Sequence, residues 1–277
     1  MTAAVLSYIE SLQKDPLRDD LRVIASCRVA GRFLGSEIAS AFQPVARLDA
    51  AGPPVVTAAQ ALARVHADSG AELSPWNLFA LAASDEQLVL LDRRCRIVHT
   101  LNFFAAAESA TLSLLLNVHP RLLPAVASDH GRAFRRVLDS LAIEAQRVVI
   151  VLPPLVSNQL DLQCQVAASY RINGFRVAAA VDDPLLLQAL FARQPVDVVR
   201  IESHRLASGP WRDGLSAALD AGAELHATRV EAEAGRTRAL ELGMTHWQGW
   251  WLARPAATPT TSLLDAGSQR EGARTPA

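Results

Sequence analysis

The chain has 277 residues, of which half are apolar and a fifth are charged. This length fits either two small domains or one large α/β barrel, and the apolar content excludes global disorder. A formal net charge of −1 gives no support for non-specific binding to nucleic acid polymers or to a membrane surface. Lys14 is the only lysine, which excludes phosphate-loop nucleotide hydrolases, protein kinases and Schiff-base enzymes, because each of these needs a lysine at a defined position.

The cysteines and the N-terminus indicate the cellular compartment. Cys27, Cys95 and Cys164 are odd in number, far apart and without a Cys-x-x-Cys pair, which predicts buried free thiols rather than a disulfide framework or a zinc site. The N-terminus lacks the basic and apolar regions of a secretory signal, and the longest apolar runs are too short to cross a membrane. We therefore expect a cytoplasmic protein.

The first 36 residues are predicted to form a helical cap. Val5, Ile9 and Leu12 recur at helical spacing, and residues 21–38 continue with apolar residues at every third or fourth position. This segment resembles no catalytic motif, so function is expected in the part of the chain that follows.

The rest of the chain alternates short β-type runs with amphipathic helical stretches. The predicted strands are residues 42–48, 55–65, 112–118, 148–152, 176–181, 196–202, 224–230 and 246–249. The predicted helices are residues 88–107, 132–141, 160–172, 185–191, 215–221 and 232–242. Such alternation indicates a parallel sheet covered by helices, and about eight units favour a (β/α)8 barrel of the TIM type over a doubly wound sheet.

A single large domain is expected between two smaller segments. The barrel is assigned to residues 37–257, and residues 258–277 are rich in Ala, Thr, Ser, Gly and Pro without periodicity, which predicts a disordered tail. In a barrel, functional side chains lie at the C-terminal ends of the strands and in the loops that follow. The histidines are scattered and are interpreted as structural.

The segments at the expected strand ends resemble, in the same order, those of an EAL domain over residues of about 38–257. The segments are AFQPVARL at 41–48, QALARV at 60–65, SGAELSPWNLFALA at 69–82, LLLNVHPRLL at 114–123, GFRVAAAVDDP at 174–184, QPVDVVRIE at 194–202 and TRVEAEAGRTRALELGMTHWQGWWLARP at 228–255. The resemblance implies a barrel with an atypical antiparallel first strand and two-metal hydrolysis of cyclic di-GMP to a linear dinucleotide. That reaction needs a metal-bound hydroxide and several carboxylates that converge on ions such as Mg²⁺ or Mn²⁺.

The implied catalytic site is degenerate at four positions. Gln60 replaces the glutamate of the name-giving motif, and its amide carries no negative charge. Val151 and Thr228 replace carboxylates, and Arg200 replaces a lysine. These replacements predict that no metal pair is bound tightly and that hydrolysis is lost, so we expect no cofactor.

Some residues of the implied metal site are retained. Asn117 and Glu231 match an asparagine and a glutamate that bind metal in the family. Asp182 and Asp183 resemble a pair of metal-binding aspartates but lie two residues late. They either reach the strand end as ligands or begin a helix before Pro184, where an acidic cap is common.

Other residues match positions that line the family's ligand cleft. They are Gln43, Leu62, Arg64 and Gln248, and an arginine can bind a phosphate through two parallel hydrogen bonds. Leu62 would serve equally well in the core, and Arg64 in a structural ion pair. Gln248, like the retained asparagine, would equally satisfy buried backbone groups.

Further arginines and tryptophans near the expected site have two interpretations each. Arg200 and Arg229 would either replace the charge of a missing metal or extend to solvent. Trp247, Trp250 and Trp251 would either stack on a guanine or, as we favour, pack under the N-terminal helix.

Three hypotheses for function follow. The first is a non-hydrolytic regulatory protein of bacterial signalling that binds cyclic di-GMP or acts as a protein-interaction module, with another protein or a second copy of the chain as partner. The second is a weak phosphodiesterase, dependent on Mg²⁺ or Mn²⁺, in which Asn117, Asp182, Asp183 and Glu231 bind metal. The third is an unrelated barrel enzyme with an unrecognised site.

Overall fold

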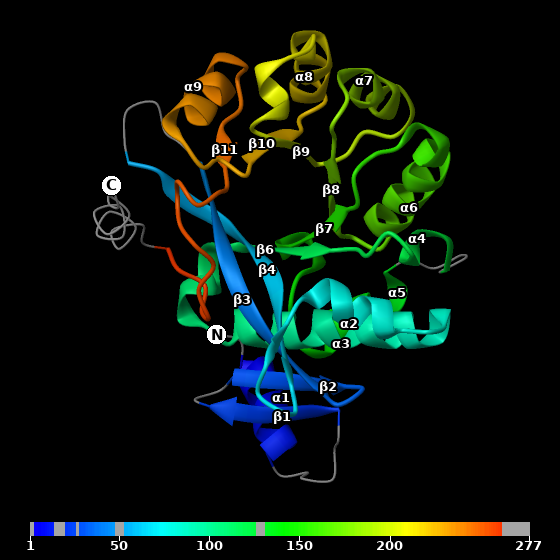
Figure 1. Cartoon of the computed structure of the whole chain (residues 1–277), viewed down its shortest axis with the longest axis vertical. Coiled ribbons are helices and arrows are strands. Elements are labelled where there is room, and N and C mark those ends of the chain that lie inside the picture. Colours follow the sequence, from blue (N-terminus) through cyan, green and yellow to red (C-terminus); the bar gives the residue numbers. More distant parts are fainter. Residues whose placement is uncertain (1–2, 14–19, 26–27, 48–52, 126–130, 262–277) are drawn as a thin grey trace.

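The computed structural model describes residues 3–13, 20–25, 28–47, 53–125 and 131–261. Its centre is a closed barrel of eight strands with helices around it, as the sequence predicts (Figure 1). The barrel strands are β3 (Ser36–Arg47), β4 (Val55–Ala67), β6 (Ser113–Asn117), β7 (Val148–Leu152), β8 (Arg176–Ala180), β9 (Val198–Glu202), β10 (Glu224–Thr228) and β11 (His246–Trp247). The helices are α1 (Ala3–Gln13), α2 (Pro75–Leu81), α3 (Asp85–Phe104), α4 (Leu122–Ala125), α5 (Arg132–Ser140), α6 (Leu160–Ile172), α7 (Pro184–Arg193), α8 (Trp211–Asp220) and α9 (Glu233–Glu241).

Each predicted barrel strand overlaps an observed one, and the first of them is antiparallel, as the resemblance implies. β3 runs antiparallel to both β4 and β11, whereas the pairs from β4 through β6 to β11 around the rest of the barrel are parallel. The C-terminal ends of the parallel strands therefore lie at one end of the barrel, where the sequence predicts function.

The prediction of a helix over residues 21–38 is wrong. Of the first 36 residues only Ala3–Gln13 is described as a helix, α1, whereas β1 (Leu21–Ala25) and β2 (Arg28–Phe33) are strands that extend the sheet below the barrel beside β3 (Figure 1). Leu34 and Gly35 have φ values of 46° and 72° and form a two-residue turn between β2 and β3. This turn type favours a hairpin, and apolar residues on its flanking strands imitated helical spacing.

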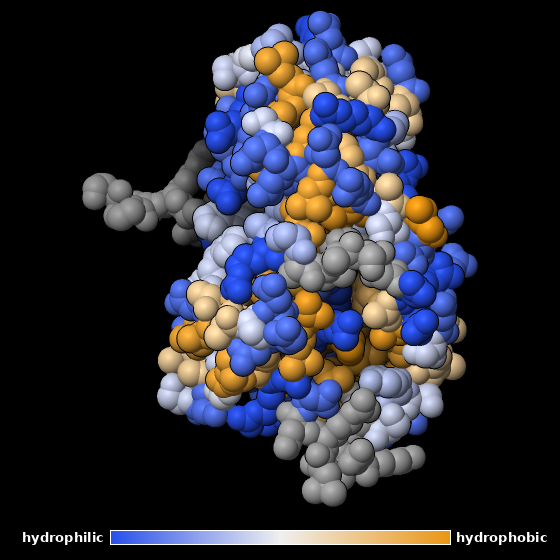
Figure 2. All heavy atoms as spheres, turned by 90° about the vertical axis from the view of Figure 1, so that its right-hand side faces the viewer, coloured by the Kyte–Doolittle hydropathy of each residue, from blue (hydrophilic) through white to orange (hydrophobic). Residues whose placement is uncertain are grey.

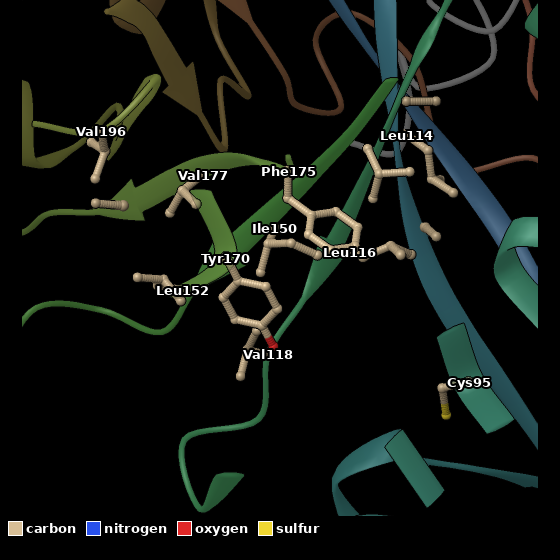
Figure 3. Close-up of a cluster of buried hydrophobic side chains, with 14 of the residues drawn as sticks. Cys95, Leu114, Leu116, Val118, Ile150, Leu152, Tyr170, Phe175, Val177 and Val196 are labelled. Atoms are coloured by element: carbon tan, nitrogen blue, oxygen red, sulfur yellow. The ribbon is translucent and has the colours of Figure 1, made fainter. Parts of the chain in front are cut away.

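Apolar side chains fill two layers of the molecule. The outer layer lies between strands and helices, where Leu116, Ile150, Tyr170 and Phe175 are close together (Figure 3). The inner layer fills the barrel itself and consists of Val45, Ala58, Leu115, Val149, Val151, Ala178 and Val198. Inward and outward positions alternate along each strand, as in other α/β barrels.

Polar and apolar side chains are mixed on the outer surface of the helices. On the face that carries α6 and α7, apolar residues are exposed among polar ones (Figure 2). Exposed apolar side chains on these helices include Ile172 and Leu185. Within the described ranges, no helix combines the length and the hydropathy that a membrane span requires.

The cysteines and the tail are only partly described. Cys95 is buried and Cys164 is partly exposed, and neither forms a disulfide. Cys27 and most of the predicted tail, residues 262–277, lie outside the described residues.

A buried polar network joins α3 to the N-terminal strands. The Asn102 side chain accepts a hydrogen bond from the Val29 nitrogen at 2.7 Å and donates one to the Val29 carbonyl at 2.8 Å. Asn102 also donates to the Ser40 hydroxyl at 3.1 Å, and that hydroxyl contacts Nδ1 of His99 at 2.8 Å. Burial, with a contribution from the charge of Arg64, lowers the pKa of His99 to about 4.

The depressed pKa of His99 predicts a loss of stability in acid. Unfolded histidine binds its proton at a pKa of about 6.5, so the unfolded state gains protons before the folded state as the pH falls. The stability that neutral His99 contributes is complete above this pH and is lost between about pH 6.5 and about pH 4. His99→Gln is expected to reduce that loss by about 3 kcal/mol in urea unfolding measured across this pH window.

His66→Gln, on β4 and outside this network, is the matched control. If the free energy of unfolding falls with pH to the same extent in wild type and in His99→Gln, the loss of stability in acid is not due to His99.

A close backbone approach fixes the chain after β11. The Val230 nitrogen donates to the Gln248 carbonyl at 3.0 Å, and the Trp251 nitrogen donates to the Val230 carbonyl at 2.9 Å. These bonds press Gly249 against Val230, so that a Cβ at Gly249 would overlap the Val230 backbone. Only glycine fits at this position.

Gly249→Ala is therefore expected to lower the free energy of unfolding by about 3 kcal/mol, as measured by chemical denaturation. Gly222→Ala is the control, because Gly222 has a φ of 81° but no atom within 4 Å of the position a Cβ would take. If both variants lose the same amount, the close approach carries no cost of its own.

Candidate functional site

A cleft of about 740 Å³ lies at the C-terminal ends of the barrel strands. Its volume falls within the range of roughly 300–1,000 Å³ that is usual for small-molecule sites. Of the twelve residues matched above to catalytic, metal-binding and ligand-contact positions of the family, all except Asp183 line it. These eleven are Gln43, Gln60, Leu62, Arg64, Asn117, Val151, Asp182, Arg200, Thr228, Glu231 and Gln248.

Amide side chains from neighbouring strands meet at the floor of the cleft. Gln60 on β4 donates to Oδ1 of Asn117 on β6 at 2.7 Å, and its own Oε1 accepts from Nε2 of Gln248 at 2.8 Å. Gln248 also donates to Oε1 of Gln43 on β3 at 3.1 Å. These four amides form one continuous hydrogen-bonded chain across the seam of the barrel.

Arg200 on β9 lies at the centre of this amide chain. Its Nη2 donates to Oε1 of Gln60 at 3.0 Å and to Oε1 of Gln248. The residue is 7 % exposed, and burial lowers the pKa of its guanidinium to about 10, so that it is still charged at neutral pH. Within the described residues it forms no ion pair, and its buried Nε has no hydrogen-bond partner.

The remaining altered positions supply no charge. Val151 belongs to the apolar layer inside the barrel, so an apolar side chain stands where the resemblance implies a carboxylate. Thr228, at the end of β10, lines the cleft, and its carbonyl accepts from the Ser203 nitrogen at 2.8 Å.

Most acidic residues of the cleft are accessible to solvent, whereas Asp92 on α3 is buried in an ion pair with Arg96 at 2.6 Å. Asp183 is the N-cap of α7, and its carboxylate accepts from the Leu185 nitrogen at 2.8 Å. Asp182 and Glu231 are exposed and line the cleft. Glu202, which sequence reasoning missed, also lines the cleft and is paired with Arg229 at 3.0 Å.

This donor set does not fit a pair of Mg²⁺ or Mn²⁺ ions. The Oε1 atoms of Gln60 and Gln248 already accept hydrogen bonds from the cationic Arg200. Among the described residues no carboxylate forms an ion pair with Arg200, so at the floor no negative charge offsets the repulsion between its guanidinium and a divalent ion.

The ligand-contact candidates form part of the cleft wall. Leu62 is partly exposed rather than buried in the core. Arg64 is also partly exposed, and its Nη1 donates to the Ala63 carbonyl at 3.0 Å. Gln43 connects the amide chain to the segment after β11 by donating to the Ala253 carbonyl at 3.3 Å.

Aromatic side chains border the cleft. Trp76 on α2 is 68 % exposed and lies near His119, which stacks on Phe79 with a centroid distance of 4.7 Å. Trp250 is 57 % exposed and is covered on one face by Arg254 at 4.4 Å. Sequence reasoning passed over Trp76, although its place directly after the Ser-Pro helix start was a usable signal.

The other two tryptophans pack, but against a different helix from the one predicted. Trp247 is 1 % exposed, and its ring lies 6.1 Å from that of Trp251. Arg236 of α9 lies over both rings, at 5.1 Å and 5.4 Å. Trp247 is thus packed, but against α9, so the predicted packing under the N-terminal helix is wrong for it. The exposure of Trp250 contradicts the packing prediction for that residue.

A second polar cluster occupies the opposite end of the barrel. Glu224 forms an ion pair with Arg176 at 2.6 Å and contacts Nε2 of His226 at 2.9 Å. The rings of His226 and His246 are 4.6 Å apart. Burial lowers the pKa of His226 to about 4 and also lowers that of His246, whereas hydrogen bonding by His226 and the charge of Arg176 outweigh burial and lower the pKa of Glu224 to about 2.

Comparisons with known proteins agree with this architecture. The EAL domain family model matches residues 27–255. The Bacillus subtilis YkuI protein, a structure with an EAL domain in complex with c-di-GMP and calcium, is 23 % identical with a TM-score of 0.63, and the match covers 84 % of this chain and 60 % of that one. A standalone EAL protein from Vibrio cholerae in its c-di-GMP-bound form is 17 % identical with a TM-score of 0.62, over 83 % of this chain and 98 % of that one.

A third similar structure is the manganese and cyclic di-GMP complex of Klebsiella pneumoniae BlrP1. It is 19 % identical with a TM-score of 0.61, and the match covers 92 % of this chain and 65 % of that one. This chain thus spans less than two thirds of the Bacillus and Klebsiella proteins, and at these identities the likeness concerns the fold. Comparison with curated protein sequences gives no match. Because the family model covers most of the barrel and the fold agrees, the chain belongs to the EAL domain family.

Proposed function

We propose that this chain binds cyclic di-GMP in the C-terminal cleft without hydrolysing it, and that it acts as a regulatory protein in bacterial signalling. The proposal is supported by membership of the EAL domain family and by the structures of similar proteins in complex with cyclic di-GMP. A protein partner or a second copy of the chain would then receive the signal.

The observation that carries the proposal is the contact of Arg200 with Gln60 and Gln248. Two amide oxygens hold a guanidinium at the floor of the cleft, where the family places metal ligands. A phosphate diester is an anion, and a guanidinium binds such oxygens through directional, charge-assisted hydrogen bonds. Arg200 would thus provide the attraction for a phosphate that a metal ion provides elsewhere.

The same contact argues against hydrolysis. Attack on a phosphodiester near neutral pH needs a strong nucleophile, such as a hydroxide generated on a metal ion. The buried charge of Arg200 opposes a divalent ion, and Val151 offers no ligand atom. We therefore expect no hydrolysis at this site.

Other side chains of the cleft suit the second phosphate and the two guanine bases of the ligand. Arg64 provides a second cation for the other phosphate, and Trp76 and Trp250 present exposed indole faces to the guanines. Stacking on an aromatic side chain contributes about 1–3 kcal/mol per base.

A weak metal-dependent phosphodiesterase is the second candidate. It is favoured by the exposed carboxylates of Asp182 and Glu231, which line the cleft together with Asn117. Such an enzyme would require an ion at the rim rather than at the floor of the cleft.

Calorimetric titration with cyclic di-GMP, in Mg²⁺ and in EDTA, separates the two candidates. We expect the same affinity in both buffers and a loss of about tenfold or more in each of Arg64→Ala and Arg200→Met, because each removes a charged hydrogen-bond donor. Arg193→Ala on α7, outside the cleft, is the matched control. Melting temperatures of all variants show whether each one is folded.

Chromatography of the same mixtures measures turnover. Linear dinucleotide that forms only with Mg²⁺ or Mn²⁺, and no longer forms in Asp182→Asn, would establish the phosphodiesterase instead. A folded protein that gives no heat with the ligand would overturn binding and favour a protein-interaction module.

Gln60→Glu, which restores the glutamate of the family motif, is expected to weaken ligand binding by about tenfold. The new carboxylate would pair with Arg200, whose Nη2 now lies 3.0 Å from Oε1 of Gln60, and would neutralise its charge. We expect no gain of Mg²⁺-dependent turnover. Tighter binding in this variant would show that Arg200 does not attract the ligand.

A further inference from the structure

The cluster at the N-terminal end of the barrel has features of a metal site. Glu224 and His246 are the first residues of β10 and β11, and His226 faces the barrel interior from the same strand as Glu224. None of the three lines the cleft, which lies at the other end of the strands. The cluster is therefore separate from the ligand site proposed above.

The three side chains point potential ligand atoms at one another. Oε2 of Glu224 lies 2.9 Å from Nε2 of His226 and 3.9 Å from Nε2 of His246. All three ligand atoms lie within 4.8 Å of one another, and in the described part of the chain no other group of His, Cys, Asp and Glu residues meets this condition.

Neighbouring groups orient the cluster. Arg176 binds Oε1 of Glu224 at 2.6 Å, which leaves Oε2 for the two imidazoles. Thr245 contacts Nδ1 of His246 at 3.1 Å, so that Nε2 is turned inward. Such outer contacts hold metal-binding histidines and carboxylates in position in known sites. The side chain of His226 is 3 % exposed, and its Nδ1 has no hydrogen-bond partner.

Two further cations lie near the cluster. Arg200 is the cross-strand neighbour of His226, and Arg47 is that of His246. The guanidinium of Arg200 is bound by Gln60 and Gln248 at the cleft end, whereas Nε2 of His226 faces Glu224. The side chain of Glu224 is 37 % exposed, so the cluster is open to solvent at the N-terminal end of the barrel.

We propose that Glu224, His226 and His246 bind one Zn²⁺ ion, with water in the fourth position. Two imidazoles and one carboxylate are a ligand set that zinc takes in proteins, whereas Mg²⁺ requires mainly oxygen ligands. The ion would replace the direct contact between Glu224 and His226 and would leave the ion pair of Arg176 in place.

A metal at this position would join the weakest strand of the barrel to its neighbour. β11 has two residues and pairs with β10 and β3 through only two residue pairs each. An ion bound by Glu224 and His226 on β10 and by His246 on β11 would fasten this closing strand.

The test uses tag-free protein that has been treated with a chelator and then titrated with Zn²⁺, Co²⁺ and Mg²⁺. We expect one Zn²⁺ per chain and a melting temperature that rises with Zn²⁺ concentration. With Co²⁺ we expect absorption bands typical of a low coordination number with nitrogen ligands. Mg²⁺ is expected to have no effect.

Variants locate the site. Glu224→Gln and His246→Gln should weaken Zn²⁺ binding by more than about 100-fold, and Arg176→Met, which removes an outer contact, by about 10–100-fold. His204→Gln is the matched control, because His204 also lies beside a glutamate, Glu202 at 3.4 Å, but outside the cluster.

Several results would overturn the proposal. One is the absence of stoichiometric Zn²⁺ binding, and another is binding that His204→Gln weakens as much as Glu224→Gln does. The wild-type Co²⁺ spectrum keeps the test valid if a variant fails to fold, since a spectrum of fully hydrated Co²⁺ would by itself exclude the site. Failure here would leave the calorimetric test of cyclic di-GMP binding unaffected.

Discussion

Closure of the barrel at β3 is the constraint on which the cleft depends. β3 pairs with β4 over its whole length but with β11 over only two residue pairs. After β11 the chain turns back, and Phe42 exchanges two backbone hydrogen bonds with Ala256 at 2.7 Å and 2.9 Å. Gln43, Gln60 and Gln248 come from β3, β4 and the end of β11, so their hydrogen bonds exist only when this seam is closed.

The seam also explains how a buried cation is tolerated. Taking a guanidinium out of water is costly unless polar groups replace the water. Gln60 and Gln248 give Arg200 two oxygen dipoles without a counter-charge, so the field of the guanidinium is not cancelled at the floor of the cleft. A carboxylate would solvate Arg200 better but would remove its attraction for an anion. The amides therefore favour an anion site over an ion pair.

The sequence predicts the barrel strands well because most of them contain a short apolar run, as at Val148–Leu152. It fails over residues 21–38, where apolar residues on two strands and a tight turn imitate helical spacing over a short window. The positions that line the cleft were also predictable, since they follow strand ends. The hydrogen-bond partners of Arg200 could not be predicted, because Gln60 and Gln248 lie 140 and 48 positions away from it in the chain.

The cluster of Glu224, His226 and His246 was overlooked for a related reason. Each histidine is isolated in the sequence, and only the register of β10 with β11, which pairs His226 with His246, brings the rings together. Asp183 shows the opposite case. Its capping of α7 depends on the adjacent Pro184 and is a local property that a sequence pattern can express.

The apolar layer inside the barrel has a kinetic consequence. Seven side chains, none more than 6 % exposed, fill the lumen beneath the cleft. The barrel is thus a cup rather than a tube, and a molecule in the cleft must leave by the mouth through which it entered. For a ligand that is not cut into a product, the lifetime of the signal at this protein is then the residence time of the intact molecule, set by the dissociation rate alone.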